Sequence, residues 1–386
     1  MLRYLNAGES HGQCLIAVLE GVPAGLPLTA EMVNVDLTRR QGGYGRGGRM
    51  RIEKDRVEFS CGVRKGKTLG NPIGLVIRNK DWENWKHVMA VEPGPAVTEK
   101  VITRPRPGHA DLVGAIKYGH RDIRNVLEKA SARETAIRVA VGAVAKALLA
   151  EFDIRIVSYT MEIGGIVAPK VEDPLLAYER AEDSQVRCPD PVAGEKMVEQ
   201  IRFAKHKGDT LGGIFEVVVT NLPIGLGSYA QWDRRLSARL AMAAMSIQAM
   251  KGVEIGLGFE AARRFGSEVH DDIYHDAEEK RFVRKTNNAG GLEGGITNGQ
   301  PIVIRVAMKP IATLYSPKDS VDIETKEPFE ATVQRSDICT VPAAGVVGEA
   351  VIAFEMANAM IEKFGGDSLD EMKRNFEAYQ AYVKEF

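Results

Sequence analysis

The segment from Arg39 to Ile52 constrains this chain more than any other stretch of its sequence. It combines five arginines with five glycines and contains no carboxylate. Guanidinium groups bind phosphates and carboxylates through paired hydrogen bonds, and glycines allow backbone N–H groups to come close to such an anion. The segment therefore predicts a site for a small molecule with several negative charges.

Three other interpretations of this segment stay open. Gly43, Gly45 and Gly48 match the G-x-G-x-x-G of dinucleotide-binding proteins, but that motif lies after a strand and before a helix. Here residues 31–39 have helical spacing and residues 50–59 alternate as a strand does, which is the reverse order. The other two interpretations are a disordered arginine–glycine segment that binds RNA and a solvated surface loop.

The overall charge of the chain is almost balanced, with 51 Lys and Arg against 52 Asp and Glu among 386 residues. The positive charge is therefore local, and we expect no nucleic-acid partner. Four well-separated cysteines without a C-x-x-C pair argue against a metal site or a redox dithiol and favour the cytoplasm. We also expect no membrane contact, because no apolar run approaches the about 20 residues of a membrane span and no signal peptide is present.

Two histidines have an unusual sequence context. His11 lies in GESHG, among small polar residues, and not on the apolar face where a packed core histidine would lie. The same five residues match the G-x-S-x-G of a hydrolase nucleophile elbow, with Ser10 as the nucleophile. His109 follows two X-Pro dipeptides in RPRPGHAD and precedes a helical pattern, so we expect it near a helix N-terminus, as a binding group or as a helix cap.

Other segments also carry binding or structural signals. The S-x-x-E capping box of Ser131 and Glu134 predicts a helix start, and Arg124 and Arg133 beside it would suit a phosphate. Residues 285–300, rich in asparagine and glycine, predict a mobile loop that closes over a ligand.

Two further segments are less informative. Asp337 beside Arg335 is either an ion pair or part of a site. Residues 81–89 contain two of the three tryptophans. We assign no catalytic or binding role to residues 81–89.

The pattern of strands and helices predicts a single α+β domain over residues 1–386, without repeats or a low-complexity linker. From Glu151 the pattern changes to short strands and a polar, proline-punctuated stretch, and we interpret residues 151–210 as a peripheral insertion. The last helix begins at the capping box of Ser368 and Glu371, and its apolar stripe should dock on the body or on another subunit.

Seven short motifs occur in one order along the chain: GESHG, RRQGGYGRGGRM, RPGHADL, SARET, NNAGGLEGGITNGQP, KPIATL, and RSD followed by PAAG. Together they resemble chorismate synthase in its shorter, monofunctional bacterial form, from Tyr4 to about Gly366. The resemblance implies a β-α-β sandwich core and a homotetramer. It also implies a 1,4-anti elimination of phosphate from 5-enolpyruvylshikimate 3-phosphate (EPSP) to chorismate, which requires reduced FMN without net redox change.

The resemblance assigns roles to individual residues. His11 would protonate the departing phosphate, His109 would protonate the reduced flavin, and Asp337 would assist removal of the ring proton. Substrate anions are expected at Arg40, Arg46, Arg49, Arg106 and Arg133. Flavin is expected at Ala130, Ser131, Ala132, Gln248, Ala249, Gly294, Lys309, Pro310, Ile311, Ala312, Thr313 and Arg335. Two of these depart from the family pattern, with Gln248 in place of asparagine and Ala130 in place of serine, so we expect backbone contacts there.

The source of the reduced flavin is a separate question. Fungal members of the family reduce their own flavin, whereas this sequence shows no separate reductase segment. We therefore expect an external flavin reductase, with NADPH as the indirect reductant, and direct use of NADPH by this chain stays open.

Overall fold

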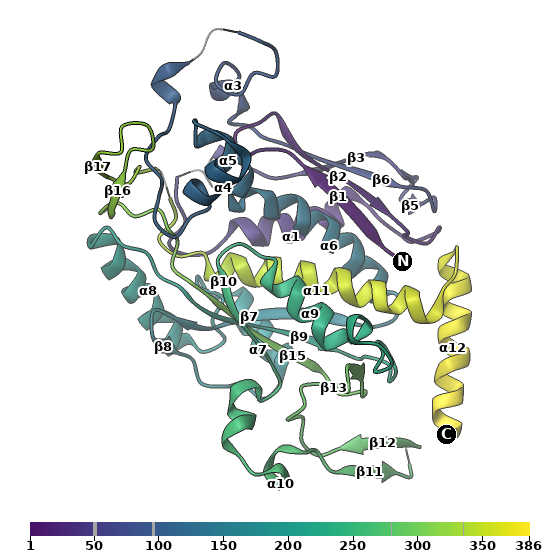
Figure 1. The fold of residues 1–386 in the computed structure, drawn as a ribbon. Coiled ribbons are helices and arrows are strands. Elements are labelled where there is room, and N and C mark those ends of the chain that lie inside the picture. The colour runs from purple at the N-terminus through teal and green to yellow at the C-terminus, as the bar shows by residue number, and fades with distance from the viewer. Residues whose placement is uncertain (49–51, 95–96, 279, 335) are drawn as a thin grey trace.

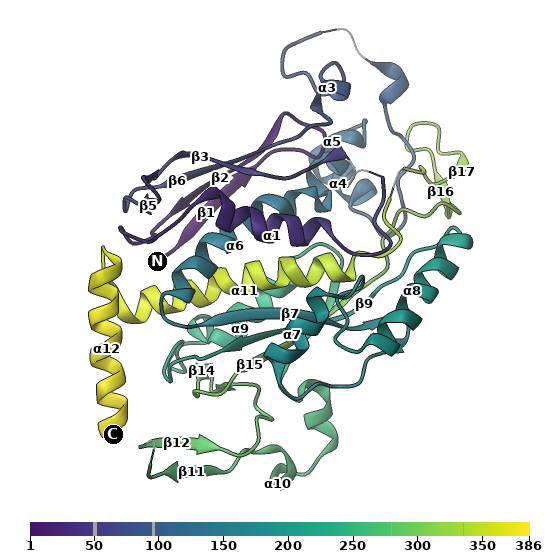
Figure 2. The ribbon, with the colours of Figure 1, turned by 180° about the vertical axis from the view of Figure 1, so that it is seen from behind.

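Two antiparallel sheets enclose a layer of helices, as the two opposite views in Figure 1 and Figure 2 show. This computed structural model describes residues 1–48, 52–94, 97–278, 280–334 and 336–386. One continuous hydrophobic cluster joins both sheets to the helices between them. The prediction of an α+β domain with a layered β-α-β core is therefore confirmed.

The first sheet has the strand order β1-β2-β6-β3. Its strands are β1 (Arg3–Ala7), β2 (Cys14–Glu20), β6 (Ile73–Arg78) and β3 (Val57–Cys61). Residues 50 and 51 of the strand predicted over residues 50–59 lie outside the described residues, and the described part becomes strand only at Val57. Glu53 and Asp55 alternate as strand residues do, but their buried carboxylates turn toward arginines and backbone N–H groups instead of joining the sheet.

The second sheet has the strand order β10-β15-β9-β7-β8. Its strands are β10 (Met250–Ile255), β15 (Ile302–Met308), β9 (Gly213–Thr220), β7 (Arg155–Ile163) and β8 (Ile166–Val167). The prediction of a peripheral insertion over residues 151–210 is wrong for β7, which pairs with β9 along its length. Helix α7 (Pro174–Glu182) packs on the outer face of this sheet, so β7 is covered on both sides.

The layer between the sheets consists of helices α1 (Ala30–Gln41), α6 (Thr135–Ala150), α9 (Leu236–Met245) and α11 (Val341–Phe364). Contrary to expectation, α11 is long and apolar enough to cross a membrane by length and composition alone. However, 89% of its most apolar window is buried within the protein. A helix that is apolar on all sides and enclosed in this way is a core helix.

Helices α6 and α11 pack at unusually close range. A Cβ atom built on Gly142 of α6 would lie 2.4 Å from the Cα atom of Ala350 in α11. No real Cβ contact is that short, so only glycine fits at this point. The two helix backbones meet there, which brings the two halves of the chain together.

A buried group of charges fixes α1 and α6 to α11. Glu349 of α11 accepts hydrogen bonds from Arg39 (2.8 Å), Lys146 (2.7 Å) and Ser158 (2.6 Å). Burial alone would raise the pKa of Glu349, but Lys146 and Arg39 hold it well below its usual value. Arg39, the first arginine of the glycine-rich segment, therefore has a structural role and does not belong to a ligand site.

The remaining elements lie around these layers. They are α3 (Trp82–Trp85), α4 (Asp111–Tyr118), α5 (Arg124–Ala130), α8 (Pro191–His206), α10 (Gly266–Val269), α12 (Leu369–Glu385), and the short strands β4 (Val63–Arg64), β5 (Lys67–Thr68), β11 (Ile273–Asp276), β12 (Arg281–Arg284), β13 (Leu292–Glu293), β14 (Ile296–Thr297), β16 (Asp319–Val321) and β17 (Pro328–Glu330). The predicted N-cap of α12 is confirmed, since Ser368 Oγ accepts from the backbone N–H of Glu371 at 3.3 Å. The apolar stripe of α12 docks on the body, with Phe376 edge-on to Phe364.

The asparagine- and glycine-rich residues 285–300 are more regular than predicted. They contain the paired strands β13 and β14. Asn287 holds the segment in place, because its side chain accepts from the Gly291 N–H and donates to the Pro301 carbonyl, both at 2.8 Å. The predicted mobility of this segment and its closure over a ligand stay predictions.

Replacement of Gly142 by alanine tests the close packing of α6 and α11. We expect Gly142→Ala to lower the free energy of unfolding by about 3 kcal/mol, because the new methyl group must push the two helices apart. Gly252→Ala is the control, since a Cβ at Gly252 would meet only ordinary contact, 3.6 Å from Ala307 Cβ. Denaturant titrations of both variants give the comparison, and equal stability of the two would contradict the close contact.

Candidate active site

A large cavity opens at one end of the helical layer. Its volume is about 1210 Å³. It is lined by the β1–β2 connection, the end of α5, the α9–β10 junction, the segment after β15, and the chain before α11. His11, His109 and Asp337, which lie far apart in the sequence, all line this one cavity.

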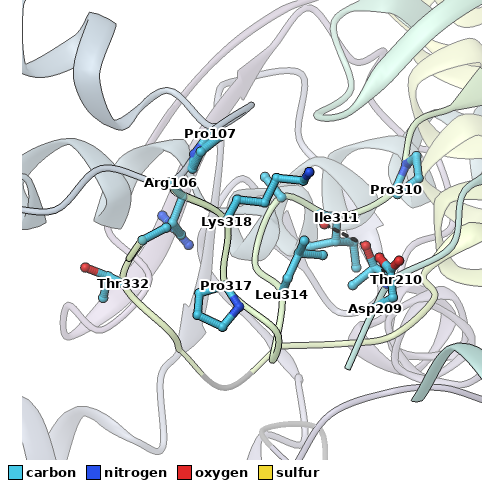
Figure 3. Close-up of a pocket in the computed structure, with 12 residues that line it drawn as sticks. Arg106, Pro107, Asp209, Thr210, Pro310, Ile311, Leu314, Pro317, Lys318 and Thr332 are labelled. Atoms are coloured by element: carbon cyan, nitrogen blue, oxygen red, sulfur yellow. Dashed lines mark hydrogen bonds between the residues drawn. The ribbon is translucent and has the colours of Figure 1, made fainter. Parts of the chain in front are cut away.

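A smaller cavity of about 230 Å³ adjoins the large one (Figure 3). Arg106, Pro310, Ile311, Ala312 and Thr332 line both cavities, so they form the wall between them. This wall is held from the far side, where Thr210 Oγ1 donates to the Ile311 carbonyl at 2.7 Å. Figure 3 draws this bond as a dashed line. The predicted run from Lys309 to Thr313 is thus a supported wall and not a free loop.

The carboxylate of Glu128 fixes the ring of His11. His11 Nδ1 lies 2.9 Å from Glu128 Oε1, and the His11 backbone N–H donates to Oε2 at 2.8 Å. Burial alone would raise the pKa of Glu128, but the hydrogen bonds from His11 lower it below its usual value. An ionised carboxylate on Nδ1 fixes the orientation of the imidazole ring, as the orienting partner of an acid–base group does.

Trp85 covers the His11 ring. The two ring centroids are 4.1 Å apart and their planes are inclined by 30°. The Arg124 guanidinium also lies over the indole, 4.9 Å from its centroid, and Arg124 Nη1 donates to Glu128 at 3.2 Å. A cation over an indole face is favourable, so Trp85 and Glu128 hold Arg124 at the cavity wall. No pattern in the sequence indicated that Trp85 belongs to a site.

His109 is oriented in a similar way by Asp111. His109 Nδ1 lies 2.6 Å from Asp111 Oδ1, and Arg106 Nε donates to Asp111 Oδ2 at 2.8 Å. Burial would raise the pKa of Asp111, but hydrogen bonds from His109 and Arg106 hold it well below its usual value. Asp111 is the first residue of α4, so His109 lies beside a helix N-terminus as predicted.

Asp337 connects the glycine-rich segment to the cavity. Its Oδ2 lies 3.2 Å from Arg46 Nε, and its Oδ1 accepts from the Gly47 backbone N–H. A Cβ at Gly47 would lie 2.9 Å from the Ser336 carbonyl oxygen, so a larger residue would not fit without a shift. The glycines therefore do allow a close approach to an anion, but the anion at Gly47 is a side chain of the protein itself.

Arg40 and Arg133 lie behind the cavity wall. Both are buried, and both face Asp55, with Arg133 Nη1 at 2.6 Å and Arg40 Nη1 at 3.5 Å from Asp55 Oδ2. Burial lowers the pKa of Arg40 to about 9. The positive charge of Arg133 also lowers this pKa, whereas the negative charge of Asp55 raises it. Arg40 also donates to the carbonyl of Ala132, which lines the cavity, at 3.0 Å. Both arginines thus stabilise the wall from behind.

Among the described residues that line the cavity, Arg106 is the only predicted substrate arginine. Arg49 lies outside the described residues, as does Arg335 of the predicted flavin site. Arg124, which was expected to suit a phosphate, also lines the cavity, and so do Lys100 and Arg104, which the sequence did not assign to any site. With Arg106 and Lys309 they make five Lys and Arg against two carboxylates, Asp81 and Asp337, in the described lining. The cavity is therefore positively charged.

Most of the predicted flavin positions surround the same cavity. Its described lining includes Ala130, Ser131, Ala132, Gln248, Ala249, Lys309, Pro310, Ile311, Ala312 and Thr313. Gly294 is not part of that lining and lies in the turn between β13 and β14. Ala249 has a positive φ of 70°, which a residue with a side chain rarely adopts, and its carbonyl accepts from the Lys309 N–H at 3.0 Å. This strained backbone joins two of the predicted flavin segments.

Gln248 has a free acceptor at the cavity. Its Nε2 donates to Glu134 at 3.0 Å, whereas its buried Oε1 has no hydrogen-bond partner among the described residues. Glu134 does not complete the predicted capping box, because it binds Gln248 and Asn6. Ser131 does cap, and it starts a short 3₁₀ turn immediately before α6. An unpaired buried acceptor is costly unless a ligand donor satisfies it.

The structure does not support the alternative interpretations of the two glycine motifs. Ser10 lies in the connection between antiparallel strands β1 and β2, and not on the strand-to-helix turn of a hydrolase elbow. Gly43 and Gly45 follow helix α1, whereas the glycines of a dinucleotide motif follow a strand. The paired Arg39, Arg40 and Arg46 also do not belong to a disordered RNA-binding segment.

Comparison with known proteins agrees with this geometry. Residues 2–361 match the family model described as chorismate synthase. The chain belongs to the chorismate synthase family. It is 59% identical to the chorismate synthases of Desulforamulus reducens and Geobacter sulfurreducens, over the full length of this chain and of both relatives. It also resembles a solved structure titled "Crystal Structure of Chorismate Synthase", with a TM-score of 0.82 and 49% identity over 100% of this chain and 99% of that one.

The low pKa of Asp111 predicts acid sensitivity for this family member. A carboxylate whose pKa is lower in the folded than in the unfolded state stabilises the fold above its unfolded pKa of about 3.9, and this contribution is lost as the pH falls below that value. We expect Asp111→Asn to destabilise the protein at pH 7, and the difference from wild type to shrink below about pH 4.

Urea titrations at several pH values measure this difference. Asp319→Asn, at an exposed position of β16, serves as the matched control and should leave the stability unchanged throughout. A difference between wild type and Asp111→Asn that is independent of pH would contradict the ionised, hydrogen-bonded state of Asp111.

Proposed function

We propose that this chain converts EPSP to chorismate by 1,4-anti elimination of phosphate, with reduced FMN as cofactor. The observation that supports this most directly is one positively charged cavity lined by His11, His109 and Asp337. EPSP has two carboxylates and a phosphate, and FMN has another phosphate, so the pair requires several cations. Because single small-molecule sites measure about 300–1,000 Å³, a cavity of about 1210 Å³ has room for two ligands.

The residues around the cavity fit a flavin. The unpaired Oε1 of Gln248 suits an N–H donor of a flavin ring, and Lys309 suits its phosphate. Backbone groups from Ala130 to Ala132 and from Lys309 to Thr313 would supply the other contacts. The chemistry that reduced FMN supplies, when bound, is a temporary donation of electron density that weakens the bond between carbon and the departing phosphate.

The hydrogen-bond partners of His11, His109 and Asp337 indicate the part that each side chain takes in proton transfer. His11, with Glu128 on Nδ1, has Nε2 to donate a proton to the departing phosphate. His109, with Asp111 on Nδ1, supplies a proton on the cofactor side of the cavity. Asp337 is the carboxylate that assists removal of the ring proton. Because hydrogen bonds from the protein fix all three groups, little reorganisation is needed when the reaction begins.

The predicted substrate arginines fall into those that line the cavity and those that lie behind its wall. Arg106 contacts the substrate anions directly, and Arg124, Lys100 and Lys309 add to the positive charge of the cavity. Arg40, Arg46 and Arg133 support the wall and the Asp337 side chain from behind. Arg49 remains a predicted substrate contact.

We extend the proposal to the cellular setting of the enzyme. The protein is a cytoplasmic homotetramer that receives reduced FMN from an external flavin reductase, with NADPH as the indirect reductant. The four cysteines are free thiols in the structure, which suits a reducing compartment.

An anaerobic assay tests the reaction directly. Photoreduced FMN and EPSP are mixed with the protein, and phosphate and chorismate are measured over time. We expect equal amounts of both products with reduced FMN and neither with oxidised FMN. Absence of phosphate release with reduced FMN would refute the reaction, and release without any flavin would refute the cofactor.

Replacement of each histidine tests its role in proton transfer. His11→Ala and His109→Ala should each lower turnover by roughly 10²- to 10⁴-fold, the usual effect of removing an acid–base group, without loss of the fold. His206→Ala, at an exposed position of α8, should have normal turnover. Turnover close to wild type in either variant would exclude that histidine as a proton donor.

Replacement of Gln248 tests the flavin site without an activity measurement. Gln248→Leu keeps the approximate volume but removes Oε1, so the dissociation constant for FMN should rise about fivefold, as for one lost hydrogen bond. Gln300→Leu is the control, because Gln300 binds the Arg284 carbonyl away from the cavity. Quenching of FMN fluorescence gives the affinity, and an unchanged value would place the flavin elsewhere.

A further inference from the structure

Trp85 completes a closed group of four side chains at the cavity wall. Its indole stacks on the imidazole of His11, with 4.1 Å between the ring centroids and 30° between the planes. Glu128 Oε1 lies 2.9 Å from His11 Nδ1 and accepts from Arg124 Nη1 at 3.2 Å. The Arg124 guanidinium carbon lies 4.9 Å from the indole centroid, so each of the four side chains contacts two others. We call these four residues the Trp85 cluster.

The carboxylate of Glu128 does not by itself fix the plane of the His11 imidazole. The last torsion of a histidine side chain joins an sp³ carbon to an sp² carbon, and its energy wells are broad. A hydrogen bond at Nδ1 therefore holds one atom of the ring, whereas Nε2 on the opposite side still moves when the ring tilts. A flat surface against the face of the ring removes this freedom, and the Trp85 indole is such a surface.

Trp85 is itself held to the body of the protein. Its indole Nε1 donates to Asp81 Oδ2 at 3.2 Å. The backbone N–H of Lys80 donates to the buried carboxylate of Glu53 at 3.0 Å, which fixes the chain immediately before α3. In Figure 1 and Figure 2, α3 lies directly above α5, the helix that contains Glu128. The indole is thus a fixed surface against which the imidazole packs.

We propose that Trp85 is a positioning residue, which holds the imidazole of His11 in the orientation needed for proton transfer to the departing phosphate. This inference rests on the proposed function, because that function makes His11 the proton donor. Stacked aromatic rings prefer defined geometries, so the indole favours one orientation of the imidazole. A displacement of about 1 Å at a reacting group can cost about 100-fold in rate. Loss of the indole should therefore slow the reaction although His11 itself is still present.

Direct stacking on a ligand is the alternative role for Trp85, because the indole also lines the cavity. Three groups of the protein already surround the indole, however. They are the imidazole of His11, the guanidinium of Arg124 and the ammonium of Lys100, whose Nζ lies 5.7 Å from the ring centroid. The two roles also differ in the constant that they change. Loss of a ligand contact raises KM or a dissociation constant, whereas loss of positioning lowers kcat.

Steady-state kinetics of phosphate release with reduced FMN test the positioning role. We expect Trp85→Ala to lower kcat roughly 10- to 100-fold. The KM for EPSP and the Kd for FMN should stay within about twofold of wild type, because Glu128 and the Lys100 carbonyl still hold Arg124. Trp85→Phe keeps a flat ring and should retain at least about a third of kcat, whereas Trp85→Leu should fall as far as Trp85→Ala. Trp232→Ala, at an indole that is 74% exposed and outside the described lining of the cavity, is the control and should have normal turnover.

A double-mutant cycle separates positioning of His11 from general support of the site. A residue that acts through His11 has nothing to position once that histidine is removed. In the His11→Ala background, Trp85→Ala should therefore lower the remaining turnover by less than about twofold. Equal losses in both backgrounds would overturn the proposal, because the indole would then act without His11. A loss confined to KM or to FMN affinity would overturn it as well, in favour of ligand stacking.

NMR of the histidine rings gives a readout that does not depend on the reaction. The chain has seven histidines, and with ¹³C-labelled histidine the signal of His11 is the one that His11→Ala removes. The indole ring current should shift this signal in the wild type, and Trp85→Ala should abolish the shift while Trp85→Phe keeps most of it. Spectra over a range of pH separate this shift from the effect of protonation. Absence of phosphate release by the wild type would refute the proposed function, whereas a His11 signal unchanged by Trp85→Ala would refute the positioning itself.

Discussion

A buried charge must have a partner, and this requirement determines how the structure is assembled. Arg133 meets Asp55, Arg106 meets Asp111, and Arg39 meets Glu349, in each case out of contact with bulk water. Removing one member of such a pair leaves the other charge uncompensated and costs several kcal/mol. The pairs therefore specify one arrangement of the helices and connections around the cavity.

The same pairing makes the active site rigid before any ligand is bound. Glu128 and Asp111 each hold one nitrogen of a histidine, and Arg46 and Gly47 hold Asp337. Since these contacts come from the protein, binding energy from the substrate is not needed to orient the acid–base groups. Arg106 and Arg124 belong to internal pairs and also line the cavity, beside Lys100 and Lys309.

The sequence predicted those parts of the structure that depend on local pattern. Helical spacing located α1 and the capping box located α12, and the order of short motifs identified the family. The pairing of His11 with Glu128 and the stacking of Trp85 on His11 could not be predicted, because these contacts join residues more than 70 positions apart and depend on the tertiary fold. Strand β7 was misjudged because its short pattern did not reveal the helices that cover both its faces.

The position of α11 near the end of the chain has a consequence for biosynthesis. The second sheet is made of strands that precede α11, yet α11 covers the inner face of β7 and β9. Until residue 364 has left the ribosome, that face has no helix to bury it, and its apolar side chains stay open to aggregation or to a chaperone. A ribosome that stalls before this point releases a nascent chain that cannot complete its core.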